Sequence, residues 1–131
     1  MRSIELADLL LIAEYALGVP AEQVARITKI SQAESALAAP FAGFGEVEFY
    51  EGVATKAAIL CSRIIRNHPL PDGNKRVAYV SMVEFIERNG GTFSHPADGQ
   101  AETAGMIERL AAREITEEAF VVWVNERTDL S

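Results

Sequence analysis

The stretch EGVATKAAILCSRIIRNHPLPDGNKRVAYVSMVEFIERNG, residues 51–90, contains two apolar segments joined by a polar loop. In the first segment apolar residues recur at helical spacing, which predicts a helix from about residue 51 to 67. Proline in the loop ends this helix, because proline disfavours helical geometry in the residue before it. The apolar residues are Val53, Ala57, Leu60, Cys61 and Ile64, and the basic residues Lys56, Arg63 and Arg66 are expected to lie elsewhere on the helix.

The second segment, residues 76–90, is apolar over most of a helical circumference. Only Ser81, Glu84 and Arg88 form a clear polar line. A helix with so little polar surface is expected to form the buried centre of the domain. The pair Gly90–Gly91 gives it a sharp end.

The same helical spacing recurs in the rest of the chain and predicts helices at 6–17, 20–27, 31–39, 98–112 and 116–126. Ser3 is expected to cap the first of them, and Ser31 to Glu34 has the form of a capping box for the third. Residues 41–50, FAGFGEVEFY, differ because polar and apolar residues alternate after two glycines. The sequence thus predicts an all-α fold of about six helices with one small β-hairpin.

Composition limits the class of protein. With 131 residues and a net charge of −7, the chain is expected to be one domain, residues 1–131, that does not bind nucleic acid directly. Its single cysteine, Cys61, excludes an internal disulfide and is expected to be a buried, inert thiol. No segment is long and apolar enough to span a membrane, and the N-terminus is unlike a signal peptide, so we expect a cytoplasmic protein.

The loop between the two central helices places Lys75 and Arg76 where the second helix begins. Cations oppose the helix dipole there, at roughly 0.3–1 kcal/mol each. This placement is explained if a multiply charged anion binds at the helix N-terminus, where Gly73 would let the backbone approach a phosphate closely. The structural alternative is a plain turn in which Asp72 caps the helix.

Two further side chains in the loop suit phosphate chemistry. His68 is a candidate general base, since histidine titrates near neutral pH, although a histidine at a helix end is as readily explained without catalysis. Asp72 is a candidate ligand for Mg²⁺, which favours one carboxylate together with phosphate oxygens and water. The conjunction of these groups within residues 68–76 is more informative than any one of them.

The segment HPLPDGNKR, residues 68–76, resembles the signature of the Fic/Doc family. In that signature H-P-F is followed by a variable residue, D or E, G-N, G or K, and R. AESALAAP, KAAILCSRIIRNH and VEFIERNG also resemble segments of Doc-type members, so the similarity covers about residues 31–90. The resemblance implies a compact helical bundle with a small β-hairpin flap.

Members of this family transfer a phosphate-containing group from a nucleotide to a hydroxyl of a target protein. By resemblance His68 would deprotonate the hydroxyl and Asp72 would hold Mg²⁺. The phosphate-binding residues would be Gly73 and Asn74 in an anion-binding turn, with Lys75 and Arg76 gripping the phosphates.

Departures from the signature indicate the subgroup. AMP-transferring members have glycine where this chain has Lys75, and a second arginine where it has Tyr79. Both differences match Doc-type toxins, which transfer the γ-phosphate of ATP to a threonine of elongation factor Tu and inhibit translation. A Fic-type nucleotide transferase and a catalytically silent binding module remain the alternatives. Leu70 replaces the usual phenylalanine and is expected to keep its place as a core anchor.

The resemblance also suggests a partner. The inhibitory motif S/T-x-x-x-E-G/N of many Fic proteins is absent, so inhibition would come from a separate Phd-like antitoxin. Residues 44–50 would either dock a target segment as an added strand or form a plain surface hairpin. Arg66 is expected to be a helix-end cation, with a position next to the site or a contact with phosphate as the alternative, and His95 is expected to be a surface residue.

Overall fold

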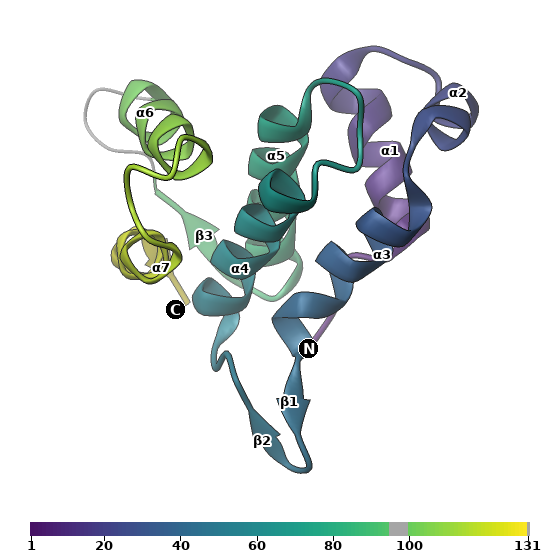
Figure 1. Ribbon diagram of the computed structural model, residues 1–131. Helices are drawn as coiled ribbons and strands as arrows, with labels where there is room; N and C mark the ends of the chain where they lie inside the picture. Colours follow the sequence, from purple (N-terminus) through teal and green to yellow (C-terminus); the bar gives the residue numbers. More distant parts are fainter. Residues whose placement is uncertain (95–99, 131) are drawn as a thin grey trace.

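The computed structural model describes residues 1–94 and 100–130, and it is mostly helical (Figure 1). Among these residues there are seven α-helices and a short 3₁₀ turn, Ala39–Phe41. The helices are α1 Leu6–Leu17, α2 Ala21–Ile27, α3 Ile30–Ala38, α4 Val53–Asn67, α5 Asn74–Arg88, α6 Gln100–Ala111 and α7 Glu117–Glu126. The all-α prediction is confirmed, and each of the seven segments expected to be helical corresponds to one of these helices, close to the expected total of about six.

Two short antiparallel pairs complete the fold. The predicted hairpin is present as β1 (Gly43–Phe44) and β2 (Val47–Glu48), paired in the register Gly43 to Glu48. The second pair, β3 (Thr92–Phe93) with β4 (Thr128–Asp129), was not predicted. Each of its strands has only two residues and the strands are far apart in the sequence, so no local alternation reveals it.

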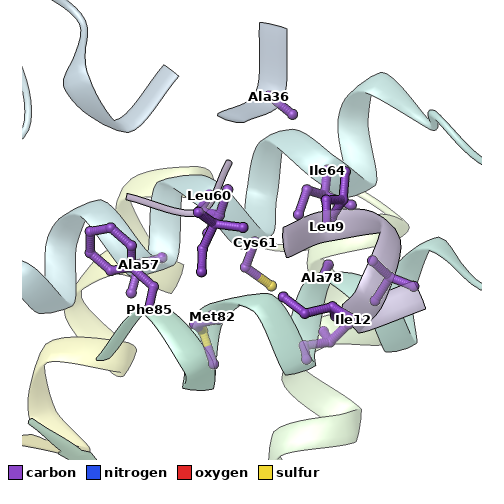
Figure 2. Packing of buried hydrophobic residues seen from close by; sticks show 14 of the residues in the cluster. Leu9, Ile12, Ala36, Ala57, Leu60, Cys61, Ile64, Ala78, Met82 and Phe85 are labelled. Atoms are coloured by element: carbon purple, nitrogen blue, oxygen red, sulfur yellow. The ribbon is translucent and has the colours of Figure 1, made fainter. Parts of the chain in front are cut away.

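Helices α4 and α5 form the centre of the bundle, as the sequence predicts. Helices α1 and α3 pack on one side of this pair, and α6 and α7 lie on the other (Figure 1). The small residues Ala57 and Ala78 are fully buried, which lets the central helices approach closely. Cys61 lies among Leu60, Met82 and other core residues (Figure 2), and burial raises the pKa of its thiol, in agreement with an inert cysteine.

Two predicted helix starts are wrong. Helix α1 begins after Glu5, whose backbone N–H donates to Asp8 at 2.9 Å, while the Ser3 hydroxyl only donates to the Glu5 side chain. Helix α3 begins at Ile30, so Ser31 lies inside it. The reason is a contact from outside the segment: the backbone N–H of Lys29 donates to the carbonyl of Pro69 at 2.9 Å and fixes the entry of the chain.

The burial of two polar residues of the central helices was not predicted. Ser81 is fully buried on α5, and among the described residues its hydroxyl has no hydrogen-bond partner. Lys56 is 1% exposed, with its ammonium 3.2 Å from the carbonyl of Pro40 and 3.0 Å from Glu48. It also donates to the carbonyl of Tyr50. A buried lysine is tolerated because each of its three N–H donors has an acceptor.

The C-terminal helices match prediction closely. Helix α6 corresponds to the helix predicted at 98–112, although Asp98 and His95 lie outside the described residues. Helix α7 is capped by Thr116, whose hydroxyl accepts from the N–H of Ala119 at 3.0 Å. No helix in the described part of the chain has both the length and the apolar character that a membrane span requires.

Candidate active site

A cavity of about 1030 Å³ lies where the loop between α4 and α5, residues 68–73, faces helices α1, α2 and α6. The sequence-predicted site residues all line it: His68, Asp72, Gly73, Asn74, Lys75 and Arg76. The remaining wall is largely apolar, formed by Leu17, Val24 and Ile27 on one side and Ala104 and Ile107 on the other. The structure therefore brings the predicted residues together in one pocket.

His68 ends helix α4 in the left-handed conformation, with φ 50° and ψ 57°. Its N–H still donates to the carbonyl of Ile64 at 3.1 Å, so it is the last residue tied to the helix. Positive φ is uncommon for a residue with a side chain and is frequent at functional sites. The turn is stabilised by Leu70, which is 2% exposed, so the predicted role of Leu70 as a core anchor is confirmed.

Asn74 holds the loop closed with its side chain. Its Oδ1 accepts from the backbone N–H of Leu70 at 3.0 Å, and its Nδ2 donates to the carbonyl of the same residue at 2.9 Å. The residue is 5% exposed. The predicted anion-binding turn would therefore use the backbone N–H of Asn74, because its amide is occupied by Leu70.

The same amide also contacts the imidazole. Nδ2 of Asn74 lies 3.1 Å from Nδ1 of His68, and the pairing with Leu70 fixes which end of the amide faces the ring. An amide nitrogen only donates, so Nδ1 of His68 must accept. In this arrangement the neutral imidazole carries its proton on Nε2. The sequence did not reveal this contact, because the spacing of residues in the loop does not distinguish an asparagine that binds anions from one that stabilises the loop.

Gly73 is required by its backbone and by its surroundings. It precedes α5 with φ 83°, a conformation that favours glycine. A Cβ added there would lie 2.4 Å from Cδ2 of Leu17, which is closer than real Cβ atoms come to other groups. The sequence indicated the first reason, but the contact with Leu17 depends on how α1 packs against the loop.

The N-terminus of α5 begins with backbone donors that have no partner within the helix itself. The first helical hydrogen bond is from the N–H of Val77 to the carbonyl of Gly73, at 3.0 Å. The N–H groups of Asn74, Lys75 and Arg76 come before it and have no carbonyl one turn earlier in the helix. Such a terminus stabilises a bound anion.

The two cations of the first turn contact opposite walls of the pocket. Nζ of Lys75 lies 2.9 Å from Oε1 of Glu108 on α6. Nη1 of Arg76 donates to the carbonyl of Ala16 on α1 at 3.3 Å. Both residues are exposed, and each side chain has a partner on a neighbouring helix beside the loop that carries His68.

Asp72 is exposed at the pocket, and its Oδ1 accepts from the N–H of Gly73 at 2.9 Å. The described residues contain no group of three His, Cys, Asp or Glu side chains that could enclose a metal ion. A divalent cation held by Asp72 would therefore take its other ligands from phosphate oxygens and water. This donor set fits Mg²⁺, which usually keeps several waters.

Arg66 belongs to a different cluster. Its Nη2 lies 3.5 Å from Glu117 on α7, and it does not line the pocket. Glu117 also accepts from Arg63 at 3.0 Å and from Ser62 at 2.6 Å. This cluster joins α4 to α7, so the structure favours the prediction that Arg66 is a helix-end cation without a role in the site.

The hairpin β1–β2 contributes no residue to the pocket. It precedes α4, whereas the loop 68–73 follows α4, so the two lie at opposite ends of a helix about 22 Å long (Figure 1). A target segment docked on the hairpin would have to continue along α4 to bring a hydroxyl to His68. The docking role of residues 44–50 stays a prediction, and it requires a target segment long enough to extend from the hairpin along α4 to the loop.

Comparisons with known proteins identify the family of this chain. A curated protein named Toxin Doc from Mycolicibacterium smegmatis is 40% identical over 57 residues, a match covering 44% of this chain and 44% of that protein. The chain thus matches less than half the length of this relative. No solved structure gives a significant match. The profile of the Fic/DOC family matches residues 3–86, which include α1 to α5 and the complete loop, and the chain therefore belongs to the Fic/DOC family.

Proposed function

We propose that this protein is a Doc-like toxin that transfers the γ-phosphate of ATP to a hydroxyl of a target protein. The acceptor is a threonine of a translation factor such as elongation factor Tu, and its modification inhibits translation. The observation that carries the proposal is that His68, Asp72, Lys75 and Arg76 line one pocket at the N-terminus of α5.

Phosphoryl transfer depends mainly on positioning and on neutralising charge. Here the helix N-terminus at the start of α5 and the side chains of Lys75 and Arg76 supply positive charge at the pocket. The cavity of about 1030 Å³ has room for a nucleotide, and its apolar walls suit a base. Bound Mg²⁺ would neutralise phosphate charge, and Asp72 is the residue that would hold it.

His68 would accept the proton of the target hydroxyl. In the observed arrangement the lone pair of the neutral ring is on Nδ1, the atom that faces Asn74. The proposal therefore requires that the ring release Asn74 or turn over when a target hydroxyl arrives. This makes Asn74 a positioning residue for the base.

Two residues favour transfer of the terminal phosphate over transfer of AMP. Lys75 stands where AMP-transferring relatives have glycine, and Tyr79 stands where they have arginine. Tyr79 lines the pocket. Burial, and to a smaller extent the nearby negative charge of Glu87, raises the pKa of its phenol. A neutral phenol cannot replace an arginine in positioning a nucleotide for AMP transfer.

A separate antitoxin is part of the proposal. The similarity to Toxin Doc and the absence of an S/T-x-x-x-E segment support inhibition by a Phd-like partner. Such a partner would order a helix against the protein when it binds.

Incubation with elongation factor Tu and ATP labelled at either the α or the γ position tests the proposal. We expect label on the target only from the γ position. Label from the α position would make the protein a nucleotide transferase, and no label from either would favour a silent binding module.

His68→Asn is the matched variant, since asparagine tolerates the left-handed backbone at this position. It should lower transfer by about 10²–10⁴-fold, as expected for loss of a general base, with nucleotide binding retained.

A further inference from the structure

Besides Asp72, the candidate metal ligand, Glu108 is a second carboxylate that lines the pocket. It lies on α6, which packs beside α5 (Figure 1), and its Oε1 is 2.9 Å from Nζ of Lys75. Both residues line the pocket. Nothing in the family signature accounts for Glu108, because the signature ends at Arg76.

The ion pair neutralises one of the two cations at the start of α5. Arg76 contacts the carbonyl of Ala16, and no carboxylate in the described part of the chain lies within ion-pair distance of its guanidinium. Within the described residues the charge of Arg76 is therefore not shared with a carboxylate, whereas that of Lys75 is shared with Glu108.

We infer that Glu108 is a specificity-determining residue of the pocket, whose carboxylate occupies Lys75 until a phosphate group of the nucleotide displaces it. This inference rests on the proposed function, since it takes the pocket to bind a triphosphate. A ligand gains the contact with Lys75 only by breaking the pair. Anions that do not reach Lys75 leave the Lys75–Glu108 pair intact. Glu108 therefore discriminates between ligands according to whether their phosphates extend as far as Lys75.

The exposure of the pair sets the size of the effect. The side chain of Lys75 is 49% exposed and that of Glu108 is 65% exposed, so solvent screens their attraction. An exposed pair of this kind is easily displaced, and its removal should change phosphate affinity by on the order of two- to fivefold. Glu108 thus adjusts the affinity and does not block the site.

A double-mutant cycle separates this action from a general effect of charge. Binding of ATP with Mg²⁺ is measured by calorimetry for the wild type, Glu108→Gln, Lys75→Met and the double variant. We expect Glu108→Gln to bind about two- to fivefold more tightly than wild type, and to have no effect when Lys75 is already replaced. Glu34→Gln, the same charge change at an exposed position on α3 away from the pocket, should not alter binding.

Two results would overturn the inference. Weaker binding by Glu108→Gln would make Glu108 a ligand-binding group, and an equal gain in the Lys75→Met background would make its effect independent of Lys75. Inorganic triphosphate, tested in the same cycle, separates this failure from failure of the proposed function. If triphosphate shows the coupling and ATP does not bind, only the nucleotide assignment is wrong. If neither binds the wild type, both proposals fail.

A second measurement needs no ligand. The chain has three lysines, of which Lys56 is buried and Lys29 is exposed. The acetylation rate of Lys75 relative to Lys29, followed by mass spectrometry, should rise in Glu108→Gln, because the amino group is no longer held as an ammonium against a carboxylate and can react as the neutral amine. An unchanged ratio would show that the pair does not form in solution.

Discussion

The amide of Asn74 and the imidazole of His68 lie 3.1 Å apart, with Nδ2 of the amide directed at Nδ1 of the ring. This contact joins the first residue of α5 to the last turn of α4 across the loop that carries the site. The contact implies that Asn74 sets the orientation of the candidate base. The side-chain amide of Asn74 does not bind the ligand itself, because Leu70 and His68 occupy it.

Replacing Asn74 with alanine should therefore affect both the loop and the ring. The backbone N–H and carbonyl of Leu70 lose their partner while buried, at a cost of about 1–3 kcal/mol in the free energy of unfolding. Urea unfolding measures this loss. Nitrogen NMR of His68 should show the Nε2–H tautomer in the wild type and a mixture of tautomers in the variant. A wild-type ring protonated on Nδ1 would contradict the assigned contact.

Gly73→Ala tests whether the close approach of Leu17 matters beyond backbone strain. Gly18→Ala is the matched control, since Gly18 has φ 70° and no atom within 4 Å of an added Cβ. Both variants should lose about 1–2 kcal/mol from the left-handed backbone. Gly73→Ala should lose more, because its Cβ would meet Leu17 at 2.4 Å, and thermal unfolding compares them. Equal losses would show that Leu17 moves aside at no cost.

The sequence predicts the central helices and the contents of the site because the relevant signals are local. Apolar spacing identifies α4 and α5, and the loop residues that line the pocket are consecutive in the chain. Prediction from the sequence fails where a residue is positioned by a segment that is distant in the chain. The start of α3 depends on Pro69, and the role of Glu108 depends on the packing of α6 beside α5.

The burial of Lys56 illustrates the same limit. Its helical position places it away from the main apolar stripe, so the sequence does not predict its burial. The acceptors that make burial possible are the carbonyls of Pro40 and Tyr50, which are brought to α4 only when the hairpin folds back. Backbone acceptors carry no sequence signal, and no pattern of side chains reveals them.

Lys56→Met should loosen the hairpin while leaving the bundle folded. The ammonium holds both ends of residues 40–50, and losing one charge-assisted hydrogen bond costs roughly 1.5–3 kcal/mol. The N–H of Phe49, which donates to the carbonyl of Ala42 at 3.0 Å, should exchange with deuterium about tenfold faster or more. Amides of α5 serve as the internal control. Faster exchange in both regions would mean that Lys56 supports the whole fold.

The last prediction concerns Glu117, which links α7 to α4 through Arg63 and Ser62. Burial disfavours the charged carboxylate, but the hydrogen bonds from Arg63 and Ser62 outweigh it and lower the pKa of Glu117 below its ordinary value of 4.5. A carboxyl whose pKa is lower in the folded state binds fewer protons there than in the unfolded chain. Its contribution to stability is therefore complete above pH 4.5 and is lost as the pH falls through the folded value.

Glu117→Gln removes this dependence because glutamine does not titrate. At pH 7 the variant should be less stable than wild type by roughly 1–2 kcal/mol, since Arg63 loses a charged partner. Urea unfolding repeated at decreasing pH should show the difference shrinking below pH 4.5, as the wild-type carboxyl becomes protonated. Glu118→Gln makes the same charge change at the exposed neighbouring position and should follow the wild-type curve. A difference that stays constant from pH 7 to strongly acidic pH would mean that Glu117 stabilises the helix junction by shape alone, without its charge.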